Sequence, residues 1–166
     1  MTERPIHSTY RTKLENGVAG GLRANSKPIF YVKSAGNSYQ EGIGVDFDPI
    51  NTLKEMIMVG AVNAFGRKSS YSAAGNSLLV VAPGGEYGFA GSTGSQFSAA
   101  IVSIDEMGCK VGYSGTEYIA DEALGFGEHP WYISSFDDPT PFVHPKNQNC
   151  DYTSLFNGTS AAAPFV

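Results

Sequence analysis

Residues 56–62, Met-Ile-Met-Val-Gly-Ala-Val, form an uninterrupted apolar run. Two similar runs flank it, Pro-Ile-Phe-Tyr-Val at residues 28–32 and Leu-Leu-Val-Val-Ala at residues 78–82. Continuous rather than alternating apolar character predicts strands that are buried on both faces, as in the parallel sheet of an α/β protein. A helix is predicted before them, over residues 10–23, decaying at Gly20-Gly21. The fold class predicted from the sequence is therefore α/β with a mostly parallel sheet.

The composition is that of an ordinary globular domain. The chain has 166 residues, of which 42% are hydrophobic and 16% are charged, which is sufficient for one core. Its formal net charge is −5, and its longest basic run is Arg67-Lys68. This balance argues against nucleic acid or an anionic membrane as a partner. Because no apolar run approaches eighteen residues, we expect no membrane-spanning helix.

The amino-acid composition of the chain changes after the third apolar run. Residues 86–156 mix glycine, serine, threonine, aspartate and aromatic residues, with one plausible strand at residues 99–104. We expect a loop-rich insert here. It contains both cysteines, Cys109 and Cys150, separated by 41 residues. In an extracellular protein these would pair, which would stabilise the fold by roughly 4 kcal/mol, whereas the alternative is two buried free thiols.

The first candidate catalytic residue lies near the end of the chain. The sequence there is Phe-Asn-Gly-Thr-Ser-Ala-Ala-Ala-Pro-Phe-Val, at residues 156–166. Gly158 permits a strained turn, and Ser160 would lie at the start of a helix formed by the alanines that follow. A hydroxyl at this place faces unpaired backbone N–H groups and the positive end of the helix, which favours the negative charge that develops around a nucleophile. The alternative is a simple N-cap, which is the commoner role of serine before an alanine run.

A second candidate follows the first apolar run. Asn37, in Ser34-Ala35-Gly36-Asn37, would project from the carboxyl end of a strand, where α/β proteins bind ligands. An asparagine amide is a fixed N–H donor and suits an oxyanion hole. The alternative is an asparagine that merely closes a turn.

Three sequence blocks together resemble the C-terminal half of the catalytic domain of subtilisin-like serine proteases. They are SAGNS at residues 34–38, VGAVNAFGRKSSYSAAG with LLVVAPGG at residues 59–85, and NGTSAAAPFV at residues 157–166. The last block has the GTSxAAPxV form that is highly specific to this family. The blocks frame residues 28–166, and the cysteine segments at residues 108–109 and 149–160 are similar to those of a bacterial, secreted, kexin-like branch.

The resemblance implies a fragment of the subtilisin-like three-layer fold and assigns roles by position. Ser160 matches the nucleophile, and Asn37 matches the side-chain donor of the oxyanion hole, to which the backbone N–H of Ser160 would add a second bond. One wall of the pocket for the residue before the scissile bond matches Lys33, Ser34, Ala35 and Gly36. The substrate would be a polypeptide, and the protein would be secreted or extracytoplasmic with any signal outside this chain. No cofactor would be required, and Ca²⁺ would be a candidate structural ion.

The sequence departs from the family in its other two catalytic residues. The family supplies its aspartate and histidine from upstream segments, and neither motif is present here. His7 lies in a context that does not match, while His129 and His144 lie in the insert. We therefore expect residues 1–166 to be part of a longer catalytic domain, lacking its N-terminal half and inactive alone. The competing hypothesis is a non-catalytic, pseudoprotease-like binding module, which would unfold cooperatively as an isolated chain.

A small acidic group follows Asn37, formed by Glu41, Asp46 and Asp48. In kexin-like relatives, acidic residues near this point hold calcium or select basic substrates. The alternative is that they are solvated loop carboxylates.

Overall fold

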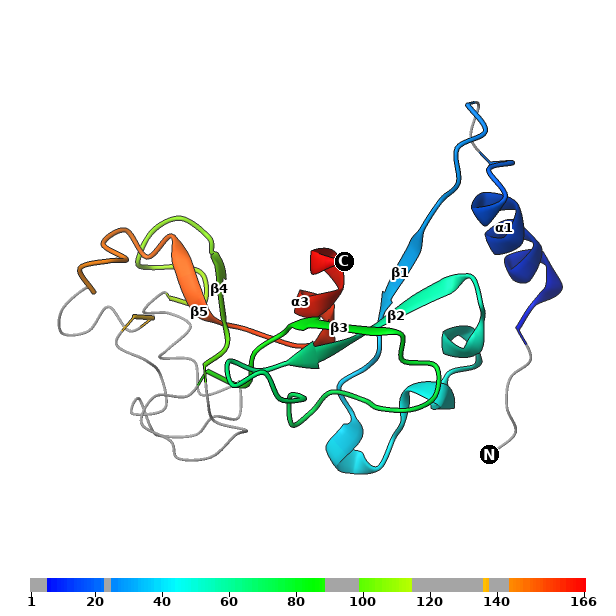
Figure 1. Cartoon of the computed structure of the whole chain (residues 1–166). Helices are drawn as coiled ribbons and strands as arrows, with labels where there is room; N and C mark the ends of the chain where they lie inside the picture. The colour runs from blue at the N-terminus through cyan, green and yellow to red at the C-terminus, as the bar shows by residue number, and fades with distance from the viewer. Residues whose placement is uncertain (1–5, 23–24, 89–98, 115–135, 138–143) are drawn as a thin grey trace.

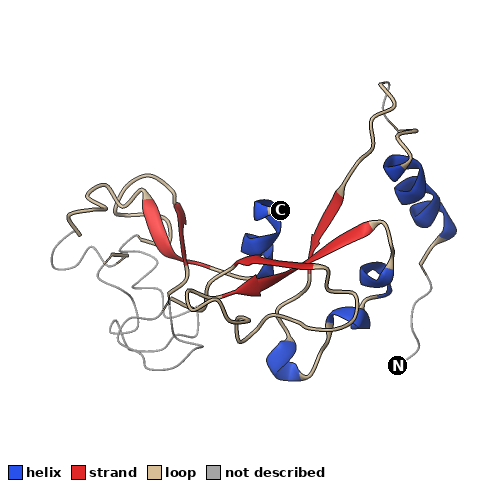
Figure 2. Cartoon of the chain, in the orientation of Figure 1, coloured by secondary structure: helices blue, strands red, loops and turns tan. Residues whose placement is uncertain are grey.

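A three-stranded parallel sheet forms the centre of the protein, as the computed structural model shows for residues 6–22, 25–88, 99–114, 136–137 and 144–166. The strand order is β1-β2-β3 (Figures 1 and 2). The bounds are Tyr31–Ser34 for β1, Met56–Val62 for β2 and Val80–Pro83 for β3. The predicted α/β class with a parallel sheet is confirmed, although β1 lies about three residues further along the chain than the apolar run that predicted it.

The middle strand, β2, carries a core on each of its faces. On one face Val59 and Ala61 pack with Ala82, Tyr71 and the C-terminal helix residue Ala162. On the other face Met58 packs with a second group of buried residues, Ala35, Val45 and Ala73. Figure 1 shows the helix α3 on one side of the sheet and the 3₁₀ turns on the other.

The prediction that all three strands are buried on both faces is wrong for β1 and β3. Val32 of β1 is 39% exposed and Val81 of β3 is 47% exposed. Within the described part of the chain each of these strands pairs only with β2. Apolar residues in these two strands are therefore not all buried.

Helical segments begin and end the chain. The helix α1 spans Ser8–Val18, and its N-cap is the His7 side chain, which accepts a hydrogen bond from the Thr9 N–H. The helix begins earlier and ends sooner than residues 10–23, because the chain turns at Gly20, whose φ is +83°. The other helical segments are the 3₁₀ turns η1 (Tyr39–Glu41), η2 (Val45–Phe47) and η3 (Pro49–Thr52), then α3 (Thr159–Ala162) and the 3₁₀ turn η7 (Ala163–Phe165). None of the helices in the described ranges is long and apolar enough to cross a membrane.

The segment predicted as a loop-rich insert contains a second, two-stranded sheet. Strand β4 (Ile101–Ile104) falls inside the predicted strand, and it pairs antiparallel with β5 (Tyr152–Phe156), which the sequence did not predict. β5 has only one fully buried residue, Thr153, so no apolar pattern marks it. Its importance is positional, because it leads directly into the turn that carries Ser160. His129 and most of residues 115–143 lie outside the described residues.

Candidate active site

Ser160 lies at an exposed position in an otherwise buried turn. The chain leaves β5, passes Gly158 and enters α3 at Thr159. Gly158 has a φ of +105°, a conformation that favours glycine. Thr159 and Ala161 are buried on either side of Ser160, which is exposed. Ser160 is thus the second residue of the helix, with Gly158 rather than Ser160 at the N-cap.

The side chain of Asn37 lies directly beside this turn. Its Oδ1 accepts hydrogen bonds from the backbone N–H of Thr159 at 2.9 Å and from the Thr159 hydroxyl at 2.8 Å. A backbone N–H can only donate, so the atom that faces Thr159 must be the amide oxygen. This fixes the orientation of the amide and turns its NH₂ group away from Thr159.

Two nitrogen atoms that can donate hydrogen bonds lie close to Gly158, on the same side of its backbone. A Cβ atom on Gly158 would lie 3.2 Å from the Asn37 Nδ2 and 3.7 Å from the backbone nitrogen of Ser160. Neither nitrogen donates a hydrogen bond to any other residue that the structure describes. An oxyanion hole is formed by N–H donors placed close together in this way.

A cavity of about 230 Å³ opens next to Asn37. Its lining includes the four residues expected to form a substrate pocket, Lys33, Ser34, Ala35 and Gly36, together with residues from the loop that follows Asn37. Lys33 points into it from β1, because Lys33 pairs with Met58 and shares its face of the sheet. The backbone N–H of Gly36 donates to the Thr159 hydroxyl at 3.1 Å, so the cavity wall is joined to the turn that carries Ser160.

Sequence reasoning missed two buried residues, Tyr71 and Glu86, that join separate turns of the chain. The Tyr71 hydroxyl accepts from the backbone N–H of Gly158 at 2.8 Å and is close enough to donate to the carbonyl oxygens of Gly84 and Gly85, at 2.7 and 2.9 Å. Burial is the main reason that the pKa of Tyr71 is raised. Glu86 is completely buried and accepts from Asn63 and from the backbone and hydroxyl of Ser70. A carboxylate directly after the turn Pro83-Gly84-Gly85 was the signal that could have drawn attention to it.

The acidic residues after Asn37 are engaged with protein groups. Asp46 accepts from the backbone N–H groups of Asn76 and Ser77 and from the Ser77 hydroxyl, and these bonds lower the pKa of Asp46. Asp48 forms an ion pair with Lys33. In the described ranges no three histidine, cysteine, aspartate or glutamate side chains are grouped as a metal site would require.

The histidines that the structure describes contact residues near them in the sequence. The Nδ1 of His7 caps α1, and the Nδ1 of His144 accepts from the Lys146 N–H while its ring lies 5.3 Å from that of Phe136. Within the described ranges neither ring is hydrogen-bonded to Ser160. The site described here thus contains the exposed Ser160, the Asn37 side chain and the adjoining cavity.

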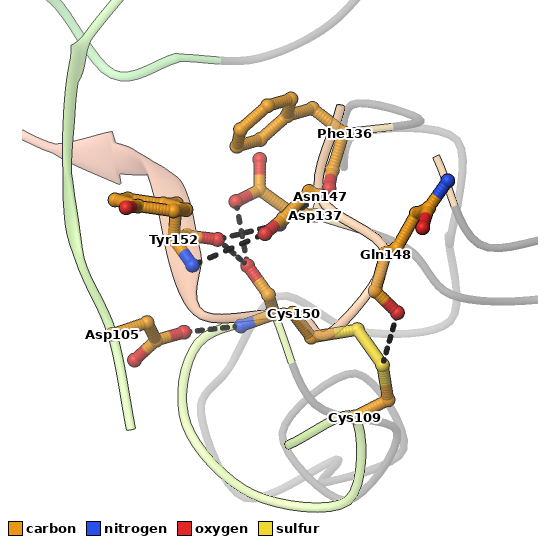
Figure 3. The surroundings of a disulfide bond; sticks show 9 residues. Asp105, Cys109, Phe136, Asp137, Asn147, Gln148, Cys150 and Tyr152 are labelled. Carbon is orange, nitrogen blue, oxygen red and sulfur yellow. Dashed lines mark hydrogen bonds between the residues drawn. A yellow bond between two sulfur atoms is a disulfide. The ribbon is translucent and has the colours of Figure 1, made fainter. Parts of the chain in front are cut away.

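A disulfide between Cys109 and Cys150 anchors the segment that leads into β5 (Figure 3). Beside it, the side chain of Asn147 donates to the carbonyl oxygens of Phe136 and Tyr152 and accepts from the Tyr152 N–H. Asp137 is buried there and accepts from the Ser154 backbone N–H. The start of β5 is therefore held by covalent and polar contacts rather than by an apolar core.

The chain is similar in sequence to known serine proteases. The chain is 31% identical over 156 residues to an Aeromonas extracellular serine protease from Aeromonas sobria, covering 81% of this chain and 21% of that protein. It is 34% identical over 123 residues to a microbial serine proteinase from Aeromonas salmonicida, covering 72% of this chain and 16% of that one. The chain thus spans about a fifth of the length of these relatives.

The chain is also similar to solved structures of a serine protease. The crystal structure of the serine protease of Aeromonas sobria matches 95% of this chain and 25% of its own with a TM-score of 0.65 and 26% identity. The structure of that protease in complex with a chaperone matches 99% of this chain and 27% of its own, with a TM-score of 0.66 and 26% identity. The family model described as "Subtilase family" matches residues 2–166. The chain therefore belongs to the subtilase family.

Proposed function

We propose that this chain supplies the nucleophile, the oxyanion hole and a substrate pocket of a secreted serine endopeptidase. The observation that supports it best is the Asn37 amide, which Thr159 holds so that its nitrogen and the backbone nitrogen of Ser160 both lie within 4 Å of one point beside Gly158. Membership of the subtilase family and the similarity to extracellular Aeromonas proteases support the same function. A disulfide suits an oxidising compartment outside the cytoplasm.

In the proposed reaction the Ser160 hydroxyl attacks the carbonyl carbon of a peptide bond. The carbonyl oxygen becomes negatively charged and accepts hydrogen bonds from the Asn37 side chain and the Ser160 backbone. A histidine takes the Ser160 proton and later donates it to the leaving amine, and an aspartate orients that histidine. We propose that both come from a segment outside residues 1–166, because His7 and His144 are engaged in their own turns.

A fluorophosphonate probe tests the proposal, because it reacts with activated serine nucleophiles. In the full-length protein that contains this chain, we expect stoichiometric labelling that mass spectrometry places on Ser160 and that the Ser160→Ala variant abolishes. Residues 1–166 alone should not be labelled, since a serine without a base is a weak nucleophile. Labelling of the full-length Ser160→Ala variant at the same rate would overturn the proposal.

A further inference from the structure

A lysine on the segment between β2 and β3 contacts the turn that follows Asn37. The Lys68 ammonium nitrogen lies 3.5 Å from the centroid of the Tyr39 ring, which is the geometry of a cation–π contact. Tyr39 comes two residues after Asn37 and begins the 3₁₀ turn η1. We propose that Lys68 is a positioning residue that holds this turn and thereby keeps the Asn37 amide in place for the oxyanion, an inference that rests on the proposed function.

The Lys68 ammonium group is fixed by backbone groups of its own segment. It donates to the carbonyl oxygens of Ser69 at 3.1 Å and Ser72 at 3.2 Å. Both serines are buried. The Ser69 hydroxyl donates to the Gly85 carbonyl at 2.7 Å, and the Ser72 hydroxyl accepts from the Ala61 N–H of β2 at 2.9 Å. Lys68 therefore extends from a segment that is bonded to the central sheet.

The Lys68 ammonium group is also partly removed from water, although the residue as a whole is exposed. Burial is the largest cause that acts on the pKa of Lys68 and lowers it, while the negative charge of Glu86 opposes this effect. A cation that has lost part of its hydration gains more from an aromatic face than a fully solvated cation does. The contact with the Tyr39 ring is therefore stronger than a contact on an open surface.

Backbone hydrogen bonds hold the chain on both sides of the proposed oxyanion-hole residue. Before it, the Gly36 carbonyl accepts from the Ala73 N–H at 2.9 Å. After it, the Tyr39 N–H donates to the Tyr71 carbonyl at 3.1 Å. Residues 68–73 therefore bracket the side chain that faces Thr159.

The turn η1 has no core of its own. None of its three residues is buried, and its N-cap, Ser38, makes no capping hydrogen bond with its side chain. Tyr39 itself is 47% exposed. Without the Lys68 cation above its ring, we expect η1 to be held less firmly, and Asn37 with it.

The contact lies outside the cavity. Neither Tyr39 nor Lys68 is among the described residues that line it. Loss of the contact should therefore weaken the hydrogen bonds to the oxyanion, which forms only in the transition state, and leave substrate binding unchanged. Such a change lowers kcat and kcat/KM by the same factor.

The test measures kcat and KM for variants of the full-length protein with one peptide substrate. Lys68→Met removes the charge but keeps an unbranched side chain, and kcat should fall by about fivefold to tenfold with KM unchanged. Lys68→Arg keeps a cation and should retain most of kcat. Tyr39→Leu should resemble Lys68→Met, whereas Tyr39→Phe keeps the ring and should resemble the unmodified protein. The control Lys54→Met removes the charge of a lysine that is 87% exposed, and should leave kcat unchanged.

A double-mutant cycle tests whether Lys68 acts through Asn37. The Asn37→Ala variant lacks the amide that Lys68 positions, so adding Lys68→Met to it should lower kcat no further. A merely structural role would lower kcat by the same factor with or without Asn37, and that result would overturn the inference. An unchanged kcat for the single variant Lys68→Met would also overturn it.

Fluorophosphonate labelling of Ser160 distinguishes failure of the inference from failure of the function. If the unmodified protein is labelled and hydrolyses the peptide while Lys68→Met does both at the same rate, the inference is wrong and the proposed function stands. If the unmodified protein is neither labelled at Ser160 nor able to hydrolyse any peptide, both are wrong.

Discussion

The hydroxyl of Tyr71 accepts a 2.8 Å hydrogen bond from the backbone N–H of Gly158, two residues before Ser160. The same hydroxyl is within donor distance of the Gly84 and Gly85 carbonyl oxygens, which follow β3. One phenol therefore joins the turn after β3 to the turn that presents the nucleophile. The joint is buried, so a lost partner there cannot be replaced by bulk water.

Tyr71→Phe should lower both stability and reactivity. The variant keeps the ring but removes one of the two acceptors of the buried Gly158 N–H, which also donates to the Gly84 carbonyl at 3.2 Å, so we expect a loss of about 0.5–1.5 kcal/mol in the free energy of unfolding. We also expect slower fluorophosphonate labelling of Ser160, because the turn at Gly158 is no longer held. The control is Tyr10→Phe, which removes a hydroxyl from an exposed position on α1. Equal unfolding free energies for Tyr71→Phe and the unmodified protein would contradict this role.

Local sequence patterns predicted part of the structure well. Residues 56–62 became β2 with the predicted bounds, and Asn37 and Ser160, singled out in separate sequence blocks, lie at one turn of the structure. Tyr71 and Glu86 were missed because their importance depends on contacts between distant turns, which no local pattern reports. Strand β5 was missed because it is held by a disulfide and polar bonds, whereas sequence patterns report apolar burial.

Thr159→Val should impair the proposed oxyanion hole while keeping the shape of the side chain. It removes the hydroxyl that donates to Asn37 and that accepts from the Gly36 N–H. The amide then depends on the Thr159 backbone N–H alone, so we expect kcat to fall more than KM rises. Thr159→Ser keeps the hydroxyl and should retain most of the activity.

The variant Asn37→Ala gives the reference value for the fall in kcat. Removing one oxyanion-hole donor costs about 10²–10³ in kcat, a magnitude established with subtilisin, a member of the same family. We expect the kcat of Thr159→Val to lie between that of Asn37→Ala and that of the unmodified protein. A Thr159→Val enzyme with unchanged kcat would show that the backbone bond alone fixes the amide.

Reducing the Cys109–Cys150 disulfide should destabilise the fold. The bond closes a separation of 41 residues, and removal of a native disulfide of this kind costs about 2–5 kcal/mol. The double variant Cys109→Ser with Cys150→Ser should have a lower Tm than the oxidised protein, and the reductant dithiothreitol should bring the unmodified protein to a similar Tm. The double variant itself should not respond to dithiothreitol. A Tm of the unmodified protein that is insensitive to reduction would contradict the prediction.

Asp46→Asn should destabilise the protein in a way that depends on pH. The pKa of Asp46 is lowered first by the Ser77 hydroxyl and then by the Asn76 N–H, so the folded protein favours the carboxylate. A lowered pKa means that the stabilisation is fully present above the ordinary aspartate value of about 3.9 and is lost as the pH falls through the lowered pKa. The difference in unfolding free energy between the unmodified protein and Asp46→Asn should therefore be constant from pH 7 to 5 and shrink below pH 4.

Urea titrations at pH 7, 5, 4 and 3 measure this difference, with Glu15→Gln on the exposed face of α1 as a control that should show no such change. A difference that grows with acidity would mean that the bonds to Asn76 and Ser77 do not stabilise the charged form.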